Sequence, residues 1–120
     1  MNKDIKLLHT LGAIAHGADD GKEYLLASMV LRRDGAIVIS HNAKTKTPTP
    51  SCHAEARVLR KSDAGATLYV ARVTRDGQWA IAKPCVNCQT AIRNKRVKRV
   101  YYTIGPNEYG IWDVMKDKNP

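Results

Sequence analysis

The sequence predicts an α/β fold, in which a mixed β-sheet of about five strands carries helices on both faces. Segments with strand-like and helix-like patterns alternate along the chain, and an Asp-Gly pair joins the first two predicted strands. This order favours a sheet that is antiparallel at its hairpin and parallel where helices cross over. The 120 residues form one expected domain, 1–120, because a chain of this length buries about two-thirds of its unfolded surface.

The first half of the chain predicts one helix and a hairpin. Ile5, Leu8, Leu11 and Ala15 recur at helical spacing and predict a helix from residue 3 to about residue 17. Residues 24–31 and 36–40 are rich in strand formers and flank the turn signal Asp34-Gly35. Residues 41–51 contain prolines and threonines without periodicity, which is typical of a loop.

The second half alternates helices and strands. Helical patterns span 53 to about 62 and 84 to about 94, and strand patterns span 67–73, 79–82 and 97–103. The run 67–73 is almost continuously apolar, which predicts a strand buried on both faces. The apolar and aromatic tail, 105–120, is expected to form a short packed helix.

Composition and charge narrow the class of protein. The content of 43% apolar and 26% charged residues is typical of a globular protein, and no apolar run approaches the ~20 residues of a membrane span. The N-terminus lacks the pattern of a secretory signal, so we expect a cytoplasmic protein without a membrane partner. The formal charge of +9 favours phosphorylated or polyanionic partners.

Two short motifs carry the candidate chemistry. His53-Ala54-Glu55 and Pro84-Cys85-Val86-Asn87-Cys88 each open a predicted helix, with 28 residues between Glu55 and Pro84. One imidazole and two thiolates suit tetrahedral Zn²⁺, and three protein ligands leave the fourth position open for water. Zinc lowers the pKa of such a water toward ~7, and Glu55 is placed to act on it as a general acid/base.

At these motifs the sequence resembles the zinc-dependent deaminases of the cytidine and deoxycytidylate deaminase superfamily, whose signature is H-x-E followed by P-C-x-x-C. The resemblance implies the cytidine deaminase-like three-layer sandwich. It implies that His53, Cys85 and Cys88 bind Zn²⁺ and that Glu55 is catalytic. It further implies hydrolysis of an amino group on a base to a carbonyl, with release of ammonia.

The resemblance also implies substrate contacts. Asn42 lies eleven residues before His53, as does a substrate-binding Asn in the similar tRNA adenosine deaminases, although it is also a typical strand-end turn residue. Ala54 lies within the first motif and Lys83 directly precedes the second, and both are candidate substrate contacts, with the backbone carbonyl of Lys83 placed to meet the leaving amine. With Lys83, the loop residues Lys44 and Lys46 are well placed to meet a phosphate.

Other interpretations of the metal motif are possible from the residues alone. A closed structural zinc site would use Cys52 or His41 as a fourth ligand, but it would not explain a carboxylate two residues after the histidine. Cys52 falls outside the ligand spacing and is expected to be a small buried residue. The remaining histidines, His9 and His16, have no matching partners and are expected on a helix surface.

The basic cluster from Arg93 to Arg99 has two interpretations. Cations at a helix C-terminus complement the macrodipole, and they also form a candidate nucleic-acid patch distant from the motifs. Tyr109 and Trp112 are candidates for closing a pocket or stacking on a base, and equally for core packing or an oligomer contact.

The expected function is zinc-dependent deamination of a small-molecule cytosine-type nucleoside or nucleotide by a homo-oligomer. An alternative is deamination of nucleic acid, either tRNA adenosine or single-stranded DNA cytosine, which needs a channel for a splayed strand. A third interpretation is a zinc-stabilised binding module without catalysis.

Overall fold

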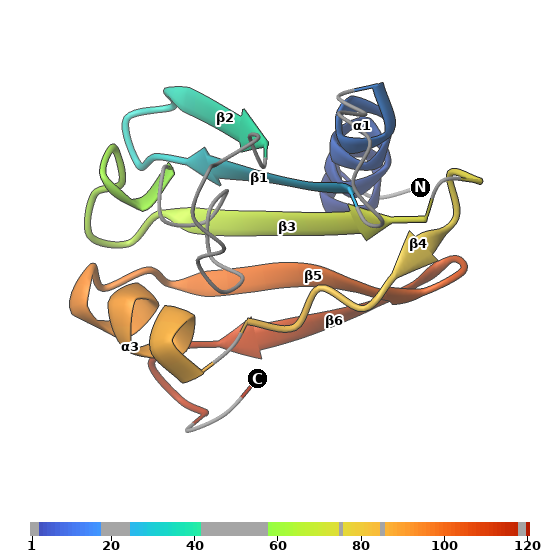
Figure 1. Cartoon of the computed structure of the whole chain (residues 1–120). Helices are drawn as coiled ribbons and strands as arrows, with labels where there is room; N and C mark the ends of the chain where they lie inside the picture. The colour runs from blue at the N-terminus through green and yellow to red at the C-terminus, as the bar shows by residue number, and fades with distance from the viewer. Residues whose placement is uncertain (1–2, 18–24, 42–57, 75, 85, 118–119) are drawn as a thin grey trace, which may run out of the picture.

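The computed structural model describes residues 3–17, 25–41, 58–74, 76–84, 86–117 and 120. Its first elements are helix α1 (Lys3–Gly17) and strands β1 (Leu25–Leu31), β2 (Ile37–His41) and β3 (Thr67–Val73). They are followed by β4 (Trp79–Ala80), helix α3 (Val86–Asn94), β5 (Arg99–Gly105) and β6 (Glu108–Asp113) (Figure 1). The alternation predicted from the sequence is therefore confirmed for the described elements.

The strands form one mixed sheet in the order β2-β1-β3-β5-β6, with the short β4 paired to β3. Neighbouring strands are antiparallel except β3 and β5, which run parallel and are joined by a crossover through α3. This mixture of antiparallel hairpins and one parallel crossover confirms the predicted topology. The sheet has six strands where about five were expected.

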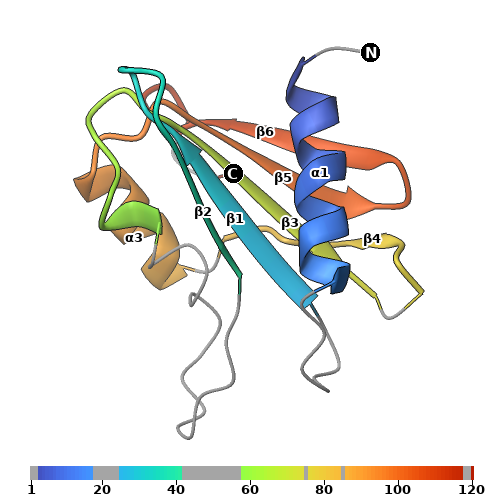
Figure 2. The same cartoon turned by 90° about the horizontal axis from the view of Figure 1, so that it is seen from above.

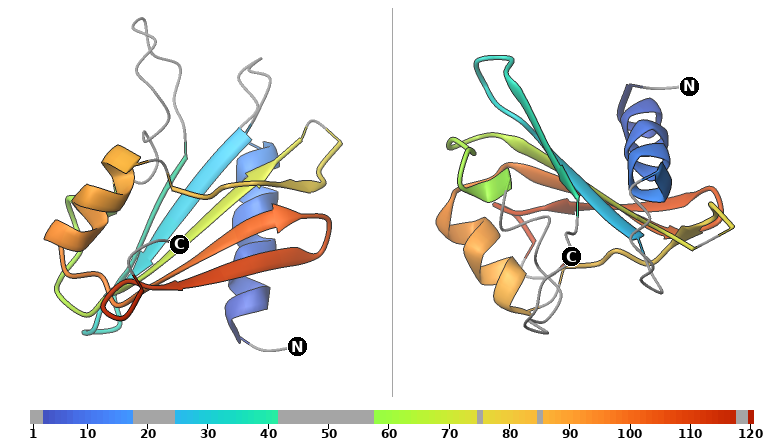
Figure 3. Two further views of the ribbon diagram at one scale, coloured as in Figure 1. Left: turned by 90° about the horizontal axis from the view of Figure 1, so that it is seen from below. Right: turned by 45° about the horizontal axis from the view of Figure 1, so that its top comes forward.

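Helices cover both faces of the sheet, as predicted (Figure 3). Strand β3 alternates between the two faces: Leu68 and Val70 pack on the side of α3, whereas Tyr69 and Ala71 pack on the side of α1. The strand is buried along nearly its whole length, which confirms the interpretation of its apolar run. Two hydrophobic clusters therefore stabilise the domain, one on each side of β3.

The tail differs from the sequence prediction. It forms a hairpin strand, β6, rather than a short packed helix, and it pairs antiparallel with β5. The two residues between the strands are Pro106 and Asn107, and Asn107 has a positive φ of 60°, which asparagine tolerates. Trp112 is fully buried on the α3 side of the sheet, so the core-packing interpretation holds for this residue. Apolar residues at both alternate and helical spacings made the tail ambiguous.

Several element boundaries also differ from the expected ones. Strand β5 begins at Arg99, two residues later than predicted, because the chain first leaves α3 through a left-handed turn. Arg96 has a φ of 55°, its N–H donates to the carbonyl of Arg93, and the N–H of Val97 donates to the carbonyl of Ile92. This is a Schellman arrangement with Arg96 at the position that glycine usually occupies.

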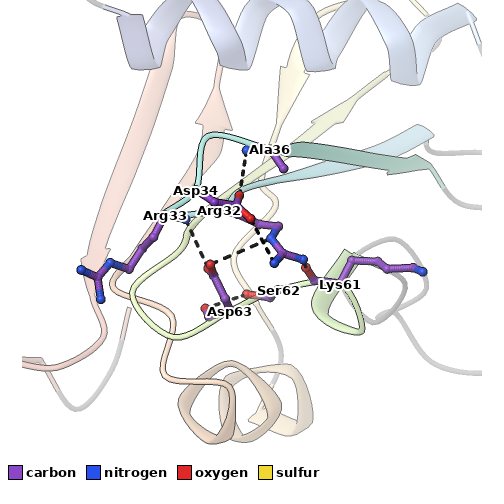
Figure 4. A network of polar contacts seen from close by, with 7 residues as sticks. All are labelled: Arg32, Arg33, Asp34, Ala36, Lys61, Ser62 and Asp63. Carbon is purple, nitrogen blue, oxygen red and sulfur yellow. Dashed lines mark hydrogen bonds and ion pairs between the residues drawn. The ribbon is translucent and has the colours of Figure 1, made fainter.

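A polar network joins the β1–β2 turn to the loop before β3 (Figure 4). Arg32 donates to the carbonyl of Lys61 at 3.0 Å and forms an ion pair with Asp34 at 3.2 Å. The backbone N–H of Arg33 donates to Asp63 at 3.3 Å. The Ala36 N–H that bonds Asp34, together with Arg32, holds the pKa of this carboxyl below its usual value. The network fixes two loops, far apart in sequence, at one end of the sheet.

A tyrosine cluster anchors the start of α1 to the sheet. The Tyr69 hydroxyl donates to the Asp4 carboxylate at 2.6 Å, and the Tyr69 ring stacks on Tyr101 with centroids 5.2 Å apart. Burial raises the pKa of Tyr69, and the nearby Asp4 carboxylate raises it further. The folded protein therefore holds the Tyr69 proton more tightly than the unfolded chain does.

Replacement of this hydroxyl, Tyr69→Phe, should lower the free energy of unfolding at neutral pH by about 1–3 kcal/mol, since the hydrogen bond goes to a charged group. The raised pKa makes the contribution of this bond fully present below about pH 10 and lost as the pH rises further. Urea unfolding of both proteins at neutral pH and above pH 10 should therefore show a smaller gap at alkaline pH.

Tyr109→Phe is the control, since the Tyr109 hydroxyl forms no hydrogen bond within the described part of the chain. An equal stability gap at both pH values for Tyr69→Phe would contradict the proposed contribution of this hydroxyl.

Candidate active site

The segments that follow the two sequence motifs pack together on one face of the sheet. Val58 and Leu59, helical residues that come three and four positions after Glu55, belong to the same buried cluster as Cys88 and Ile92 of α3. Figure 2 shows this helical segment and α3 on the same side of the sheet, away from α1. The fold therefore brings the polypeptide following each motif to a common face, as a shared site requires.

Most of the predicted site residues lie outside the described residues. These are Asn42, His53, Ala54, Glu55 and Cys85, together with Cys52, Lys44 and Lys46. Cys88 and Lys83 are described, and no group of three or more His, Cys, Asp or Glu side chains suited to a metal occurs within the described ranges. The described part of the site therefore consists of α3 and the segment that leads into it.

Helix α3 places Cys88 in its first turn. The Cys88 side chain is buried, with 2% of the residue exposed, and the first turn of the helix contains no acidic side chain. Unpaired backbone N–H groups and the positive end of the helix dipole favour deprotonated sulfur at this position. The chemistry of this end of α3 thus fits a thiolate that binds a metal such as zinc.

Cys88 is disulfide-bonded in the structure. A disulfide and a zinc site make a similar demand on the fold, since each needs two cysteine sulfurs close to each other. The two states exclude each other, because zinc binds thiolates. Zinc binding therefore requires Cys88 in its reduced form, which is the usual state of cysteine in the cytosol.

Gln89 connects the two ends of the Pro-Cys-x-x-Cys segment. Its side-chain amide donates to the carbonyl of Pro84 at 2.8 Å, and both residues are buried. Pro84 lies two residues before the start of α3, and a buried carbonyl of this kind needs a hydrogen-bond donor. Gln89, directly after Cys88, thereby fixes the Pro84 carbonyl, which leads into Cys85. Gln89 is therefore a positioning residue of this segment.

Thr103 of β5 fixes the approach to α3. The Thr103 hydroxyl accepts the N–H of Arg72 at 3.1 Å and donates to the carbonyl of Ala80 at 2.7 Å. The Thr103 carbonyl accepts the N–H of Ala82 at 2.9 Å. The residue is fully buried, so it ties the segment after β4 to the sheet. Lys83 follows this anchor directly and is exposed, with its neighbour Pro84 buried.

Ser28 is a further buried polar residue on the α3 side of the sheet. It lies in β1 between Leu26 and Val30, which both belong to the α3-side cluster, and it pairs in register with Ser40 of β2. Its hydroxyl has no hydrogen-bond partner among the described residues. The buried Ser28 hydroxyl thus lies in the β1–β2 pair, and Asn42 directly follows the last residue of β2.

Sequence reasoning did not identify Gln89, Thr103 or Ser28. A glutamine after the second cysteine has no recognisable pattern, because its partner is a backbone carbonyl five residues earlier. Ser28 interrupts an apolar strand and was in principle visible as a polar residue on a core face.

Solved structures with the same fold include the crystal structure of cytidine deaminase from Mycobacterium tuberculosis, with a TM-score of 0.52 and 17% identity. That match covers 84% of this chain and 85% of that chain. A glutamate-to-glutamine mutant of that enzyme matches with a TM-score of 0.53 and 16% identity, over 91% of this chain and 100% of that one. Cytidine deaminase from Mycobacterium leprae matches with a TM-score of 0.51 and 15% identity, over 85% and 90%. The predicted three-layer fold is therefore confirmed.

No helix within the described ranges has the length and apolar character to cross a membrane. A search of curated proteins gives no match to the chain. The family model described as the cytidine and deoxycytidylate deaminase zinc-binding region matches residues 1–104, which include both motifs and all elements through most of β5. On this match and the shared fold, the chain belongs to the cytidine and deoxycytidylate deaminase family.

Proposed function

We propose that the protein is a zinc-dependent hydrolase that deaminates a cytosine-type nucleoside or nucleotide, cytidine, deoxycytidine or dCMP, to the uracil product and ammonia. The observation that carries this proposal is the position of Cys88. It lies buried in the first turn of α3 and packs in one cluster with the helical residues that follow His53-Ala54-Glu55. Family membership supports the same chemistry.

The residues have distinct roles in this proposal. His53, Cys85 and Cys88 would hold Zn²⁺, which when bound supplies a hydroxide nucleophile near neutral pH. Glu55 accepts the proton released from water and delivers protons to the ring nitrogen and the leaving amine. The C–N bond to the amine breaks, a carbonyl forms on the ring, and ammonia leaves.

Substrate contacts are assigned to the residues around these motifs. Asn42 would bind the sugar or the base edge, Ala54 would adjoin the base, and the Lys83 carbonyl would contact the leaving amine. The Lys83 side chain is exposed directly before the buried Pro84, which suits contact with a phosphate at the mouth of the site. We further propose that residues 1–120 form a single domain that acts in the cytoplasm as a homo-oligomer.

A panel of substrates tests the proposed class. Ammonia release from cytidine, deoxycytidine and dCMP should exceed release from guanine, tRNA and single-stranded DNA. Turnover of the polymers alone would assign a nucleic-acid deaminase. Release from none of the substrates by zinc-loaded protein would favour the non-catalytic binding module.

Zinc content tests the ligand assignment. The reduced protein should bind one zinc ion per chain, and Cys88→Ser should lose it because a hydroxyl is a poor substitute for a thiolate. Plasma emission analysis after dialysis measures the metal. Cys52→Ala is the matched control and should retain zinc. Loss of zinc in the control with retention in Cys88→Ser would overturn the assignment.

Removal of the proposed proton carrier tests the mechanism. Glu55→Ala should retain zinc and a normal melting temperature while deamination falls by at least ~10²- to 10⁴-fold, since a general acid/base is lost. Zinc content, melting and ammonia release are measured on one preparation. Normal turnover in this variant would show that another group activates the water.

The Gln89 hydrogen bond should affect metal retention. Gln89→Met keeps the side-chain length but removes the side-chain donor to the buried Pro84 carbonyl, which should cost about 1–3 kcal/mol of unfolding free energy. Positioning groups around metal ligands typically change metal affinity by about 10- to 100-fold. We therefore expect faster zinc transfer from substrate-free Gln89→Met to a chelator.

Thr90→Val is the control for this measurement. Its hydroxyl also donates to a backbone carbonyl of α3, that of Val86, but the residue is exposed and its hydrogen bond does not involve the buried Pro84 carbonyl. Equal rates of zinc transfer to the chelator for the wild type and Gln89→Met would contradict a role of Gln89 in positioning the metal ligands.

A further inference from the structure

One end of the molecule collects four loops that are distant in sequence. These are the β1–β2 turn, the loop before β3, the α3–β5 connection and the segment after β6, which lie together at the end of the sheet where β3 begins (Figure 1). We call this end the basic pole. Its cations are Arg32, Arg33, Arg60, Lys61, Arg93, Lys95, Arg96, Lys98, Arg99 and Lys116.

Backbone and side-chain hydrogen bonds hold these loops together. Arg32 donates to the Lys61 carbonyl, which joins the first two loops. The N–H of Gly65 donates to the Arg96 carbonyl at 2.8 Å, and that of Lys98 donates to Ala66 at 2.8 Å. The N–H of Val114 donates to the Lys98 carbonyl at 3.1 Å, which adds the segment after β6. The cations are therefore presented on a connected framework.

The basic pole contains ten of the fourteen Lys and Arg residues in the described ranges, against four acidic residues, Asp34, Asp63, Asp113 and Asp117. All of these cations except Arg32 are exposed. Arg32 pairs with Asp34 and Asp63, and Arg99 lies 4.0 Å from Asp113. Arg93 lies over the Trp112 ring, with its guanidinium carbon 5.2 Å from the ring centroid. Arg33, Arg60, Lys61, Lys95, Arg96, Lys98 and Lys116 form no ion pair with an acidic side chain within the described ranges.

The helix dipole accounts for only part of this charge. Its influence falls off within the last turn of a helix, which contains Arg93, and Lys95 follows directly after the end of α3. Arg33 and Lys116 belong to other loops and gain nothing from the end of α3. The sequence alone shows a run of five cations from Arg93 to Arg99. The fold adds five more to this end of the molecule, from the β1–β2 turn, the loop before β3 and the segment after β6.

We propose that the basic pole binds the phosphate backbone of nucleic acid, independently of sequence. Six of its ten cations are arginines, whose planar guanidinium binds phosphate through two hydrogen bonds. Apart from Arg93 at the end of α3 and Arg99 at the start of β5, the cations of the pole lie in connecting segments. The described pole includes only the last turn of α3 and no whole amphipathic helix, which is a usual means of binding an anionic membrane. Charge complementarity with a repeating phosphate backbone therefore identifies the partner.

This binding site is distinct from the proposed active site. Cys88 lies in the first turn of α3, whereas Arg93 lies in the last turn, and the loops of the pole lie at the end of the sheet where β3 begins (Figure 1). The inference goes beyond the proposed function and does not depend on it, because binding at the pole requires neither zinc nor Glu55. The two can therefore fail separately.

Fluorescence anisotropy with labelled single-stranded DNA and RNA, over a range of salt concentrations, tests the proposal on the full chain. Arg96→Asn with Lys98→Gln removes two exposed cations, and asparagine tolerates the left-handed backbone at position 96. We expect about tenfold weaker binding. The slope of log affinity against log salt should fall by about 0.7 for each phosphate that the variant no longer neutralises.

The control removes the same charge elsewhere. Lys3→Gln with Lys6→Gln lowers the net charge equally on exposed positions of α1, outside the pole, and should change affinity less than about twofold. Ammonia release from free cytidine should be unchanged in both double variants.

Equal weakening by both double variants would show that net charge alone attracts the nucleic acid, and would overturn the assignment to the pole. Absence of binding by the wild type at low salt would also overturn it. Binding to vesicles of anionic phospholipid without binding to either oligonucleotide would replace nucleic acid by a membrane surface as the partner.

Discussion

The parallel pairing of β3 and β5 is the constraint on which the rest of the structure depends. Parallel strands cannot be joined by a tight turn, so the chain must cross over through α3 on one face of the sheet. The crossover places the first turn of α3, with Cys88, toward the end of β3 where Thr103 and β4 fix the incoming chain. The position of the candidate thiolate is thus a consequence of strand direction, and Gln89 then refines the local peptide geometry.

The central strand also explains why the domain needs helices on both sides. Because β3 is buried on both faces, a helix on one face alone would leave either Tyr69 and Ala71 or Leu68 and Val70 in water. Helix α1 covers the first set, and its contact is strengthened by the Asp4–Tyr69 hydrogen bond. The opposite cluster packs against α3 and the residues after Glu55, so the candidate chemistry lies on the face of the sheet away from α1.

Patterns of buried residues allowed most of the fold to be predicted from the sequence. The run from Thr67 to Val73 and the Asp34-Gly35 turn act over short distances, so local periodicity was sufficient. The tail was predicted wrongly because Ile111, Trp112 and Met115 fit a helix, whereas pairing with β5 makes it a strand. At the site, the motifs predicted ligand types and spacing. The Gln89–Pro84 bond depends on tertiary geometry that spacing does not encode, and the roles of His53, Glu55 and Cys85 stay predictions.

The two ends of α3 have opposite electrostatic requirements, and this polarity relates the site to the basic pole. The first turn presents N–H groups without acidic neighbours, which favours anionic sulfur, while the last turn presents carbonyls that favour cations. Arg93 and Lys95 lie at the C-terminal end of α3, beside the turns that carry Arg33 and Lys61. These segments meet because β1 ends, and β3 and β5 begin, at the same end of the sheet. Helix direction thus separates the candidate thiolate site from a concentration of positive charge within a domain 37 Å long.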